Sequence, residues 1–549
     1  MTDLIAVARG DLAPDLVIEN ARVFCTHTRE WLDGDVAIAG DRFAGIGSYE
    51  GGERIDAAGR FLVPGYIDAH VHIESSKLML DEFARVVLSH GTTAVVCDPH
   101  ELANVLGVPG VEWLLEATEW LPLDVFCMAP SCVPASPFES PGAAFGIADL
   151  ERLLAHPRVL GVAEMMNFPA VIAGDPRELA KIALAGRVDG HAPAVAGREL
   201  DAYLATGIST DHEATTAEEA LARRRRGCFV LIREASNARN LRALLELVRD
   251  HGPEFCAFCT DDREPDFLVR EGHLDQMCRV AVAEGIAPED ALVMATLNPA
   301  LCHGLERRGA IAPGYLADCL LLDDLSSFTP ALVIKSGGRV AAVPRVRVPS
   351  WARATVNAAP IAPAQLATPS EGTVRVIGMI PDQLLTRSLE LPADAAGLAT
   401  VCVVERHGAS GRIGLGKVLG FGLCEGAFAT TVAHDAHNII CIGCDEASMV
   451  LSIERLGELG GGIVISRGGR VVGELALPVA GLLSEQPASV VVELLDALQD
   501  ELARQGVTLP SPFMAASFLA LSVIPSLKIT DHGLVDVDRF ELVPLQVKA

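Results

Sequence analysis

The sequence has few positive charges for its size. Its 549 residues include 44 lysines and arginines against 72 aspartates and glutamates, so the formal net charge is -28 at pH 7. A negative field of this size repels phosphate backbones and anionic lipid headgroups, so we expect neither nucleic acid nor a membrane surface as a partner. The basic run from Arg223 to Arg226 ends a helix-like stretch that begins near Thr216. We interpret it as a solvated helix end, where cations suit the helix dipole.

Long hydrophobic runs are also missing. No uninterrupted apolar run approaches the ~20 residues that a membrane helix needs. Residues 1–10 carry neither the basic start nor the apolar core of a secretory signal. We therefore expect a cytoplasmic protein, and an apolar share of 50% supplies ample material for globular cores.

The 14 cysteines do not indicate a disulfide framework, which belongs to small secreted domains. Two pairs have the CxxC spacing of zinc and redox sites: Cys256 with Cys259, and Cys441 with Cys444. Both pairs lie in strand-like stretches, where residues three apart point to opposite faces and are poorly placed to share a metal. We predict that these cysteines are free, buried, small apolar residues.

The chain is too long for one hydrophobic core, because single cores stop growing at about 250–300 residues. Short alternating runs with turn signals occur on both flanks of a central region. They predict a small β-sandwich domain formed from residues 1–60 and 305–345. Residues 346–372 are rich in alanine and proline and are predicted to be a linker. Residues 373–549 mix glycine-punctuated strands with helical segments, which indicates an additional α+β C-terminal domain.

In the central region, residues 61–304, apolar β-rich runs alternate with helical segments. This pattern is typical of βα units with a parallel sheet covered on both faces. About eight such units in about 250 residues predict a TIM-type (β/α)8 barrel, so the fold class is α/β. The strands are expected at residues 62–68, 93–98, 123–129, 159–164, 187–190, 207–211, 228–233 and 256–260.

The first candidate for chemistry is Asp68-Ala69-His70-Val71-His72, at the end of a predicted strand. Histidines two residues apart share one face of a strand, so both imidazoles can reach one metal ion. On its own the motif fits a pair of packed or surface histidines equally well.

Other predicted strands also end in metal-competent residues, at the rim where TIM barrels place their active sites. Glu164 ends the fourth strand, His191 the fifth, His212 the sixth and Asp261 the eighth. Each has an ordinary alternative: Glu164 could pair with an arginine, the histidines could be satisfied core residues, and Asp261 could cap a helix. Six such residues on one rim favour a metal centre.

The order and spacing of these six residues resemble the amidohydrolase superfamily, which has HxH on the first strand, histidines on the fifth and sixth, and aspartate on the eighth. The resemblance implies a two-metal site. In many members the ligand that bridges the metals is a carboxylated lysine on the fourth strand. Here the sequence has Glu164 in Ala163-Glu164-Met165-Met166, an acid that can bridge without modification, which is characteristic of adenine deaminases.

The resemblance to adenine deaminases extends along nearly the whole chain, and it implies deamination of adenine to hypoxanthine by a homo-oligomer. One departure is Ala235, where glycine is expected, and it concerns loop geometry rather than chemistry. The segments that carry the resemblance are Pro64-Gly65-Tyr66-Ile67-Asp68, His72-Ile73-Glu74-Ser75-Ser76, Asp98-Pro99-His100-Glu101, Pro130-Ser131-Cys132-Val133-Pro134, Asp189-Gly190-His191-Ala192-Pro193, Asp211-His212-Glu213, Ile232-Arg233-Glu234, Thr260-Asp261-Asp262-Arg263 and, in the C-terminal domain, Thr431-Val432-Ala433-His434-Asp435-Ala436-His437-Asn438.

The expected mechanism starts from two divalent cations, which lower the pKa of a bridging water. The mixed ligand set suits Mn, Fe or Zn, and the resemblance favours Mn or Fe(II). Asp261 is expected to accept the proton of the water and deliver it to the leaving amine. Glu101 and Glu74 are candidates for protonating a ring nitrogen, with Glu101 preferred. Either could instead orient a histidine ligand.

Three residues of the C-terminal domain, His434, Asp435 and His437, leave two interpretations open. They could reach the barrel mouth of their own chain or of a symmetry mate. They could equally well stabilise only their own loop.

Competing functions are also considered. Zinc deaminases with an HxE motif followed by PCxxC are excluded, because His72-Ile73-Glu74 matches the first half and no PCxxC follows. A cyclic-amide hydrolase of the dihydroorotase or hydantoinase type would share the metal site but would normally have lysine in place of Glu164. A non-catalytic binding protein on a decayed barrel is disfavoured by the presence of every expected ligand.

Overall fold

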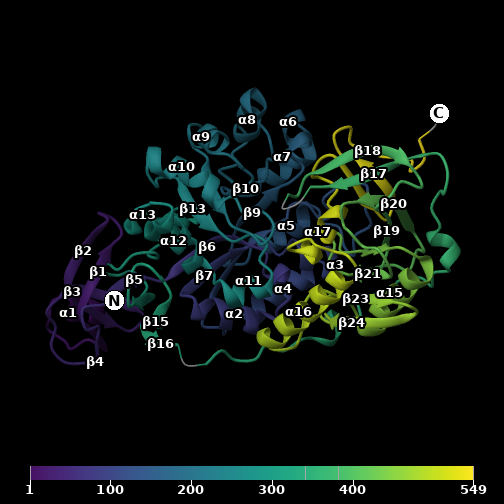
Figure 1. Cartoon of the computed structure of the whole chain (residues 1–549). Coiled ribbons are helices and arrows are strands. Elements are labelled where there is room, and N and C mark those ends of the chain that lie inside the picture. Colours follow the sequence, from purple (N-terminus) through teal and green to yellow (C-terminus); the bar gives the residue numbers. More distant parts are fainter. Residues whose placement is uncertain (1, 341, 381–382, 548–549) are drawn as a thin grey trace.

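The computed structural model describes residues 2–340, 342–380 and 383–547. The chain forms three parts in a row: an N-terminal sheet, a central barrel, and a C-terminal domain that continues from green to yellow in Figure 1. Among the described residues, no helix combines the length and the apolar character that crossing a membrane requires.

The central part is a parallel α/β barrel, as predicted. Five strands pair in the order β10-β9-β8-β7-β6 and three in the order β11-β12-β13. A parallel bridge from Val71 to Asp261 joins the two ends of the series, and the Ser209 N–H donates to the Val188 carbonyl between β10 and β11. The strands are β6 (Tyr66–Val71), β7 (Thr92–Cys97), β8 (Asp124–Ala129), β9 (Val159–Met165), β10 (Val188–Gly190), β11 (Thr210–Asp211), β12 (Phe229–Arg233) and β13 (Cys256–Cys259).

The barrel strands are buried on both faces because helices cover them outside and side chains fill the inside. Every residue of β7 and β13 is buried, which explains their nearly continuous apolar sequence. The helices present one apolar face each; α10 buries five leucine and valine side chains and ends before Gly252, whose φ is +75°. The barrel helices are η1 (Ile73–Ser76), α2 (Leu80–Ser89), α3 (His100–Leu106), α4 (Val108–Thr118), α5 (Ile147–Leu154), α6 (Phe168–Ala173), α7 (Pro176–Ile182), α8 (Gly197–Leu204), α9 (Ala217–Arg224), α10 (Leu241–His251), α11 (Pro265–Arg270), α12 (Leu274–Ala283), α13 (Pro288–Ala295) and α14 (Leu297–His303).

The N-terminal sheet uses strands from both flanks of the barrel. Its eight strands form one hydrogen-bonded network in the order β16-β15-β14-β5-β1-β2-β3, with β4 pairing β1. The two flanks meet where β14 runs antiparallel to β5. The elements are α1 (Thr2–Ala8), β1 (Leu16–Cys25), β2 (Glu30–Ala39), β3 (Arg42–Gly47), β4 (Glu53–Asp56), β5 (Phe61–Pro64), β14 (Cys319–Leu322), β15 (Pro330–Lys335) and β16 (Gly338–Arg339).

The C-terminal domain combines a mixed eight-stranded sheet, in the order β18-β17-β20-β19-β22-β21-β23-β24, with helices and a small sheet of three strands. Its elements are β17 (Thr373–Met379), β18 (Thr386–Pro392), β19 (Leu398–Val404), β20 (Ile413–Leu419), β21 (Ala427–Thr430), β22 (Ile439–Gly443), α15 (Glu446–Leu459), β23 (Gly462–Arg467), β24 (Arg470–Ala476), α16 (Ala488–Arg504), α17 (Pro512–Ser517), η4 (Phe518–Ala520), β25 (Leu527–Thr530), β26 (Gly533–Asp536) and β27 (Glu541–Val543).

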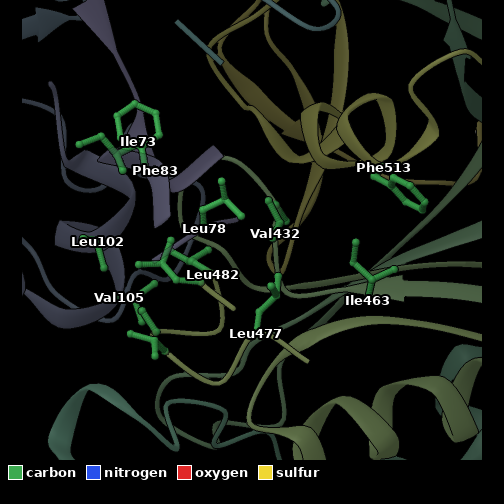
Figure 2. Packing of buried hydrophobic residues seen from close by; sticks show 14 of the residues in the cluster. Ile73, Leu78, Phe83, Leu102, Val105, Val432, Ile463, Leu477, Leu482 and Phe513 are labelled. Carbon is green, nitrogen blue, oxygen red and sulfur yellow. The ribbon is translucent and has the colours of Figure 1, made fainter. Parts of the chain in front are cut away.

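The barrel and the C-terminal domain share one hydrophobic core. Leu78 of the barrel lies beside Val432 and Leu482 of the C-terminal domain in Figure 2, and all three belong to the same buried cluster. The Ser484 N–H also donates to the Lys77 carbonyl over 2.8 Å. This contact holds the C-terminal domain against the segment that follows β6, at the active rim of the barrel.

The segment predicted as a linker contains two short helices, η2 (Ser350–Ala352) and η3 (Pro363–Leu366). Ala352 is buried in the core shared with the barrel, and Leu366 is buried in a cluster of the C-terminal domain. Its apolar residues are therefore used for packing, although their spacing follows no helix or strand period.

All 14 cysteines lie in the described part of the chain and are free, as predicted. Cys256, Cys259 and Cys441 are buried. The prediction is wrong for Cys444, which is exposed, because β22 ends at Gly443 and the chain turns outward before α15.

Candidate active site

Four of the predicted ligands surround one point at the carboxyl ends of the barrel strands. The Nε2 atoms of His70 and His72 lie 3.1 Å apart. His72 Nε2 is 3.2 Å from Glu164 Oε1 and 3.2 Å from Asp261 Oδ1. The His72 Nδ1–H donates to the Asp98 carbonyl over 2.9 Å, so the lone pair of Nε2 faces the two carboxylates.

The other carboxylate oxygen of Glu164 faces a second pair of imidazoles. Glu164 Oε2 lies 2.7 Å from His191 Nδ1 and 3.4 Å from His212 Nε2. Glu164 therefore stands between two histidine pairs, with one oxygen toward each. This is the arrangement that a carboxylate bridging two cations requires.

The residues present fit a pair of bound metal ions. All six residues are at most 6% exposed. They form sets of three, such as His70, His72 and Glu164, whose ligand atoms all lie within 4.8 Å of one another. Although burial alone would raise them, the neighbouring histidines hold the pKa values of Glu164 and Asp261 well below the usual range. Once the imidazoles give up their protons, the two buried carboxylates and the imidazole nitrogens form a donor set that divalent cations satisfy.

Asp261 is held in an unusual backbone conformation. Its φ is +54°, in the left-handed region, which aspartate adopts more readily than most residues. Its N–H donates to the His70 carbonyl over 3.0 Å and its carbonyl accepts from the His72 N–H over 3.2 Å. Arg233 Nη1 donates to Asp261 Oδ2 over 2.9 Å and also binds Glu213. These contacts direct the carboxylate into the cluster.

Arg223 positions the two strands that end in His191 and His212. It is 1% exposed; its Nε donates to Asp211 Oδ1 over 2.6 Å and its Nη2 to the Ala192 carbonyl over 2.7 Å. The interpretation of the basic run as a solvated helix end is therefore wrong for this residue, because α9 packs Arg223 inward, whereas the rest of the run is more exposed.

A small cavity opens above the ligand cluster. Barrel residues and residues of the C-terminal domain of the same chain line it together. The His434 ring stacks on Phe518, with centroids 4.5 Å apart and an interplanar angle of 11°. The lining residues from the C-terminal domain are Leu384, His434, Asp435, Phe518 and Leu521.

Glu101 and Glu74, the candidates for protonating the substrate, do not line this cavity. Glu74 Oε1 accepts from the Leu102 N–H, and burial together with the nearby Glu101 raises the pKa of Glu74 to about 7. Glu101 Oε1 accepts from the Ser75 hydroxyl over 2.8 Å, and the same hydroxyl lies 2.5 Å from Oδ1 of Asp262, which does line the cavity. Glu101 thus reaches the cavity through two other side chains.

Comparison with known proteins agrees with this geometry. Residues 61–340 match the Amidohydrolase family, and residues 385–541 match the Adenine deaminase C-terminal domain. The protein named adenine deaminase from Methylobacterium sp. (strain 4-46) is 48% identical, over 98% of this chain and 99% of its own. That from Archaeoglobus fulgidus is 46% identical, over 99% of this chain and 97% of its own. The chain belongs to the adenine deaminase family of amidohydrolases.

Five residues in or behind this site have no role in the predictions made from the sequence. These are His100, Glu213, Arg233 and Asp262, which line the cavity, and Arg223, which lies behind the histidines. His100, Glu213 and Asp262 each stand next to a predicted ligand or acid in sequence, and Arg233 lies in the segment Ile232-Arg233-Glu234 that carries the resemblance. Proximity in sequence to Glu101, His212 and Asp261 is the signal that could have found the first three; Arg223 carries no such signal.

Proposed function

We propose that this chain catalyses the hydrolytic deamination of adenine to hypoxanthine and ammonia. The observation that carries the proposal is the position of Glu164, with one carboxylate oxygen toward His70 and His72 and the other toward His191 and His212. Relatives named adenine deaminase, which match this chain over 99% and 97% of their own length, support the same reaction.

The metal ions are proposed to be Mn or Fe(II), with Zn as a further candidate, since imidazole and carboxylate ligands suit all three. His70, His72 and Asp261 would hold one ion, His191 and His212 the other, and Glu164 would bridge them. When bound, the two ions would lower the pKa of a shared water and so supply a nucleophile at neutral pH.

Asp261 is proposed to move the proton. Its low pKa keeps the carboxyl group ionised, so that an unprotonated oxygen is available to the attacking water, and its position beside His70 and His72 keeps it next to the reacting atoms. The same carboxyl group then delivers the proton to the leaving amine as the carbon–nitrogen bond breaks. Arg233 donates to Oδ2 of Asp261 and so fixes the orientation of the carboxylate.

The acid that protonates the ring is proposed to be Asp262, supplied by Glu101 through Ser75. A hydroxyl has one proton to donate, yet Ser75 Oγ contacts a carboxylate oxygen on each side. Both contacts are satisfied when one of the two carboxyl groups carries a proton and donates it to Oγ. Ser75 thus links Glu101 to Asp262 at the cavity, and Glu101 acts as a positioning residue rather than in contact with substrate.

The experiment that tests the proposal is Glu164→Gln. An amide has the same shape but lacks the full negative charge that a ligand between two cations requires, so metal affinity and adenine turnover should fall together. Metal content and the adenine-to-hypoxanthine rate are measured on the same sample, with Glu178→Gln, a buried acid outside the cluster, as the matched control. Wild-type turnover in Glu164→Gln would contradict the proposal.

A further inference from the structure

A second group of metal-competent side chains lies beside the six-ligand cluster. His100 begins α3 of the barrel, and His434 and Asp435 belong to the loop between β21 and β22 of the C-terminal domain. Asp435 Oδ1 is 3.6 Å from His100 Nε2 and 3.4 Å from His434 Nδ1. Ligand atoms 2.0–2.2 Å from a tetrahedral ion lie about 3.4 Å from one another, so these separations are those of a shared ion.

The tautomer of His100 leaves its Nε2 free to bind a cation. Its Nδ1 is 3.0 Å from Asp98 Oδ2, and a carboxylate oxygen accepts, so Nδ1 carries the proton. The lone pair of Nε2 therefore faces Asp435. A carboxylate that orients a histidine in this way is the usual support of a metal-binding imidazole.

The other two side chains are buried with unused polar atoms. His434 and Asp435 are each 2% exposed, and within the described part of the chain Asp435 Oδ2 and His434 Nε2 have no hydrogen-bond partner. A buried carboxylate without donors is costly, and its contacts to both imidazoles exceed hydrogen-bond distance. A cation among the three would compensate the charge.

We propose that His100, His434 and Asp435 bind a third divalent transition-metal ion. Two imidazoles and one carboxylate suit Mn, Fe(II) or Zn and leave coordination positions open. All three residues line the cavity, so these positions face the space where a substrate would lie. The ion would also tie the C-terminal loop to the barrel, because its ligands come from both. This site goes beyond the proposed deamination and does not depend on it.

One neighbouring trio, Glu101, His434 and His437, has similar spacing but the wrong tautomer. The Ala433 N–H donates to His437 Nδ1 over 3.1 Å, so in the neutral ring the proton is on Nε2. That Nε2 faces Glu101 Oε2 at 3.5 Å. His437 therefore presents a donor toward Glu101 rather than a lone pair toward a cation.

The test is the metal content of the full-length protein after reconstitution with Mn²⁺ and removal of loose ions. His434→Ala and Asp435→Asn should each hold one ion per chain fewer than the wild type, whereas His437→Gln should match the wild type. Asp435→Asn preserves side-chain shape, which guards against a folding defect in His434→Ala. It also removes the only negative charge among the three ligands, whereas Glu164 remains in the main cluster when Asp261 is replaced. Because the readout is a difference in bound ions, it is independent of whether adenine is the substrate or of how many ions the main cluster holds.

Equal metal content in the wild type, His434→Ala and Asp435→Asn would overturn the proposal. Loss of one ion in His437→Gln with full content in Asp435→Asn would overturn this ligand set and assign the ion to the trio with Glu101. Anomalous diffraction from Mn²⁺-soaked crystals gives a second readout, with a peak expected among His100, His434 and Asp435.

Discussion

In the proposed mechanism Asp261 meets two demands at once, since it holds a cation and also carries a proton. The first demand favours a strongly ionised carboxylate, which His70, His72 and Arg233 provide. The second needs a carboxylate oxygen beside the reacting atoms, and Oδ1, which faces the histidines, is so placed while Arg233 holds Oδ2. The left-handed backbone conformation is the cost of this orientation, and two backbone hydrogen bonds to the β6 segment offset it.

Asp261→Asn separates the two demands. Asparagine keeps the shape and one oxygen ligand, so part of the metal should remain, but it cannot accept a proton from water. Positioned acid–base groups contribute about 10²–10⁴-fold, so kcat for adenine should fall by at least about 10²-fold. Metal content is measured in the same sample. A fully metallated variant within a few-fold of wild type would assign proton transfer to another group.

Ser75→Ala tests the proton path from Glu101 to Asp262. Removing the hydroxyl breaks the link without touching a metal ligand, so kcat should fall about 10²-fold while KM and metal content stay near the wild-type values. Ser76→Ala is the control, because that buried neighbour bonds the Ile73 carbonyl instead. An unchanged kcat in Ser75→Ala, or an equal loss in Ser76→Ala, would remove the relay from the mechanism.

The sequence predicts which residues end the barrel strands, and hence the six side chains that converge. It does not predict their partners, because those contacts join residues that follow different strands: Ser75 meets Asp262, which is 187 positions away in sequence, and Arg233 meets Asp261. The prediction that Glu74 and Glu101 approach the substrate follows from strand order alone. The turn at η1 and the start of α3 instead place both side chains behind the lining.

At the scale of elements, the barrel has a weak region at β10 and β11. These strands have three and two residues and carry His191 and His212 at their ends. Arg223 compensates by joining Asp211 to the Ala192 carbonyl from α9, so a helix on the outside of the barrel sets the spacing of two histidines inside it. The basic run in the sequence gives no sign of this, because helix periodicity alone cannot tell which arginine faces inward.

Arg223→Met should therefore weaken both stability and metal binding. Breaking a buried ion pair costs about 3–5 kcal/mol, mainly because Asp211 is left uncompensated. The free energy of unfolding and metal content report the two effects. Arg225→Met, on the exposed part of the same run, should change the free energy of unfolding by less than about 0.5 kcal/mol. A loss as small in Arg223→Met would show that the strands need no such support.

Two short segments of the C-terminal domain bring its side chains to the cavity. The loop between β21 and β22 brings His434 to the cavity, and η4 brings Phe518 to stack on it. The sequence leaves open whether these residues reach the barrel of their own chain. The structure shows that they do, because the core shared by Leu78, Val432 and Leu482 docks the domain on the active rim. Apolar residues in the two regions give no sign of pairing in sequence.

For the whole molecule, the barrel and the sheet built from both flanks follow directly from alternating apolar patterns, and these parts of the fold were predictable. The packing of the C-terminal domain depends on long-range contacts and was not. Together the domains enclose a small cavity above a buried cluster in which Glu164 stands between two histidine pairs.

The most direct test of the account is the ultraviolet spectrum of adenine incubated with the full-length protein after reconstitution with Mn²⁺ or Fe²⁺. If the chain deaminates adenine, we expect complete conversion to the spectrum of hypoxanthine, with one ammonia released per adenine and no conversion by the metal-free protein. An unchanged adenine spectrum, in a sample shown to hold at least two ions per chain, would contradict it.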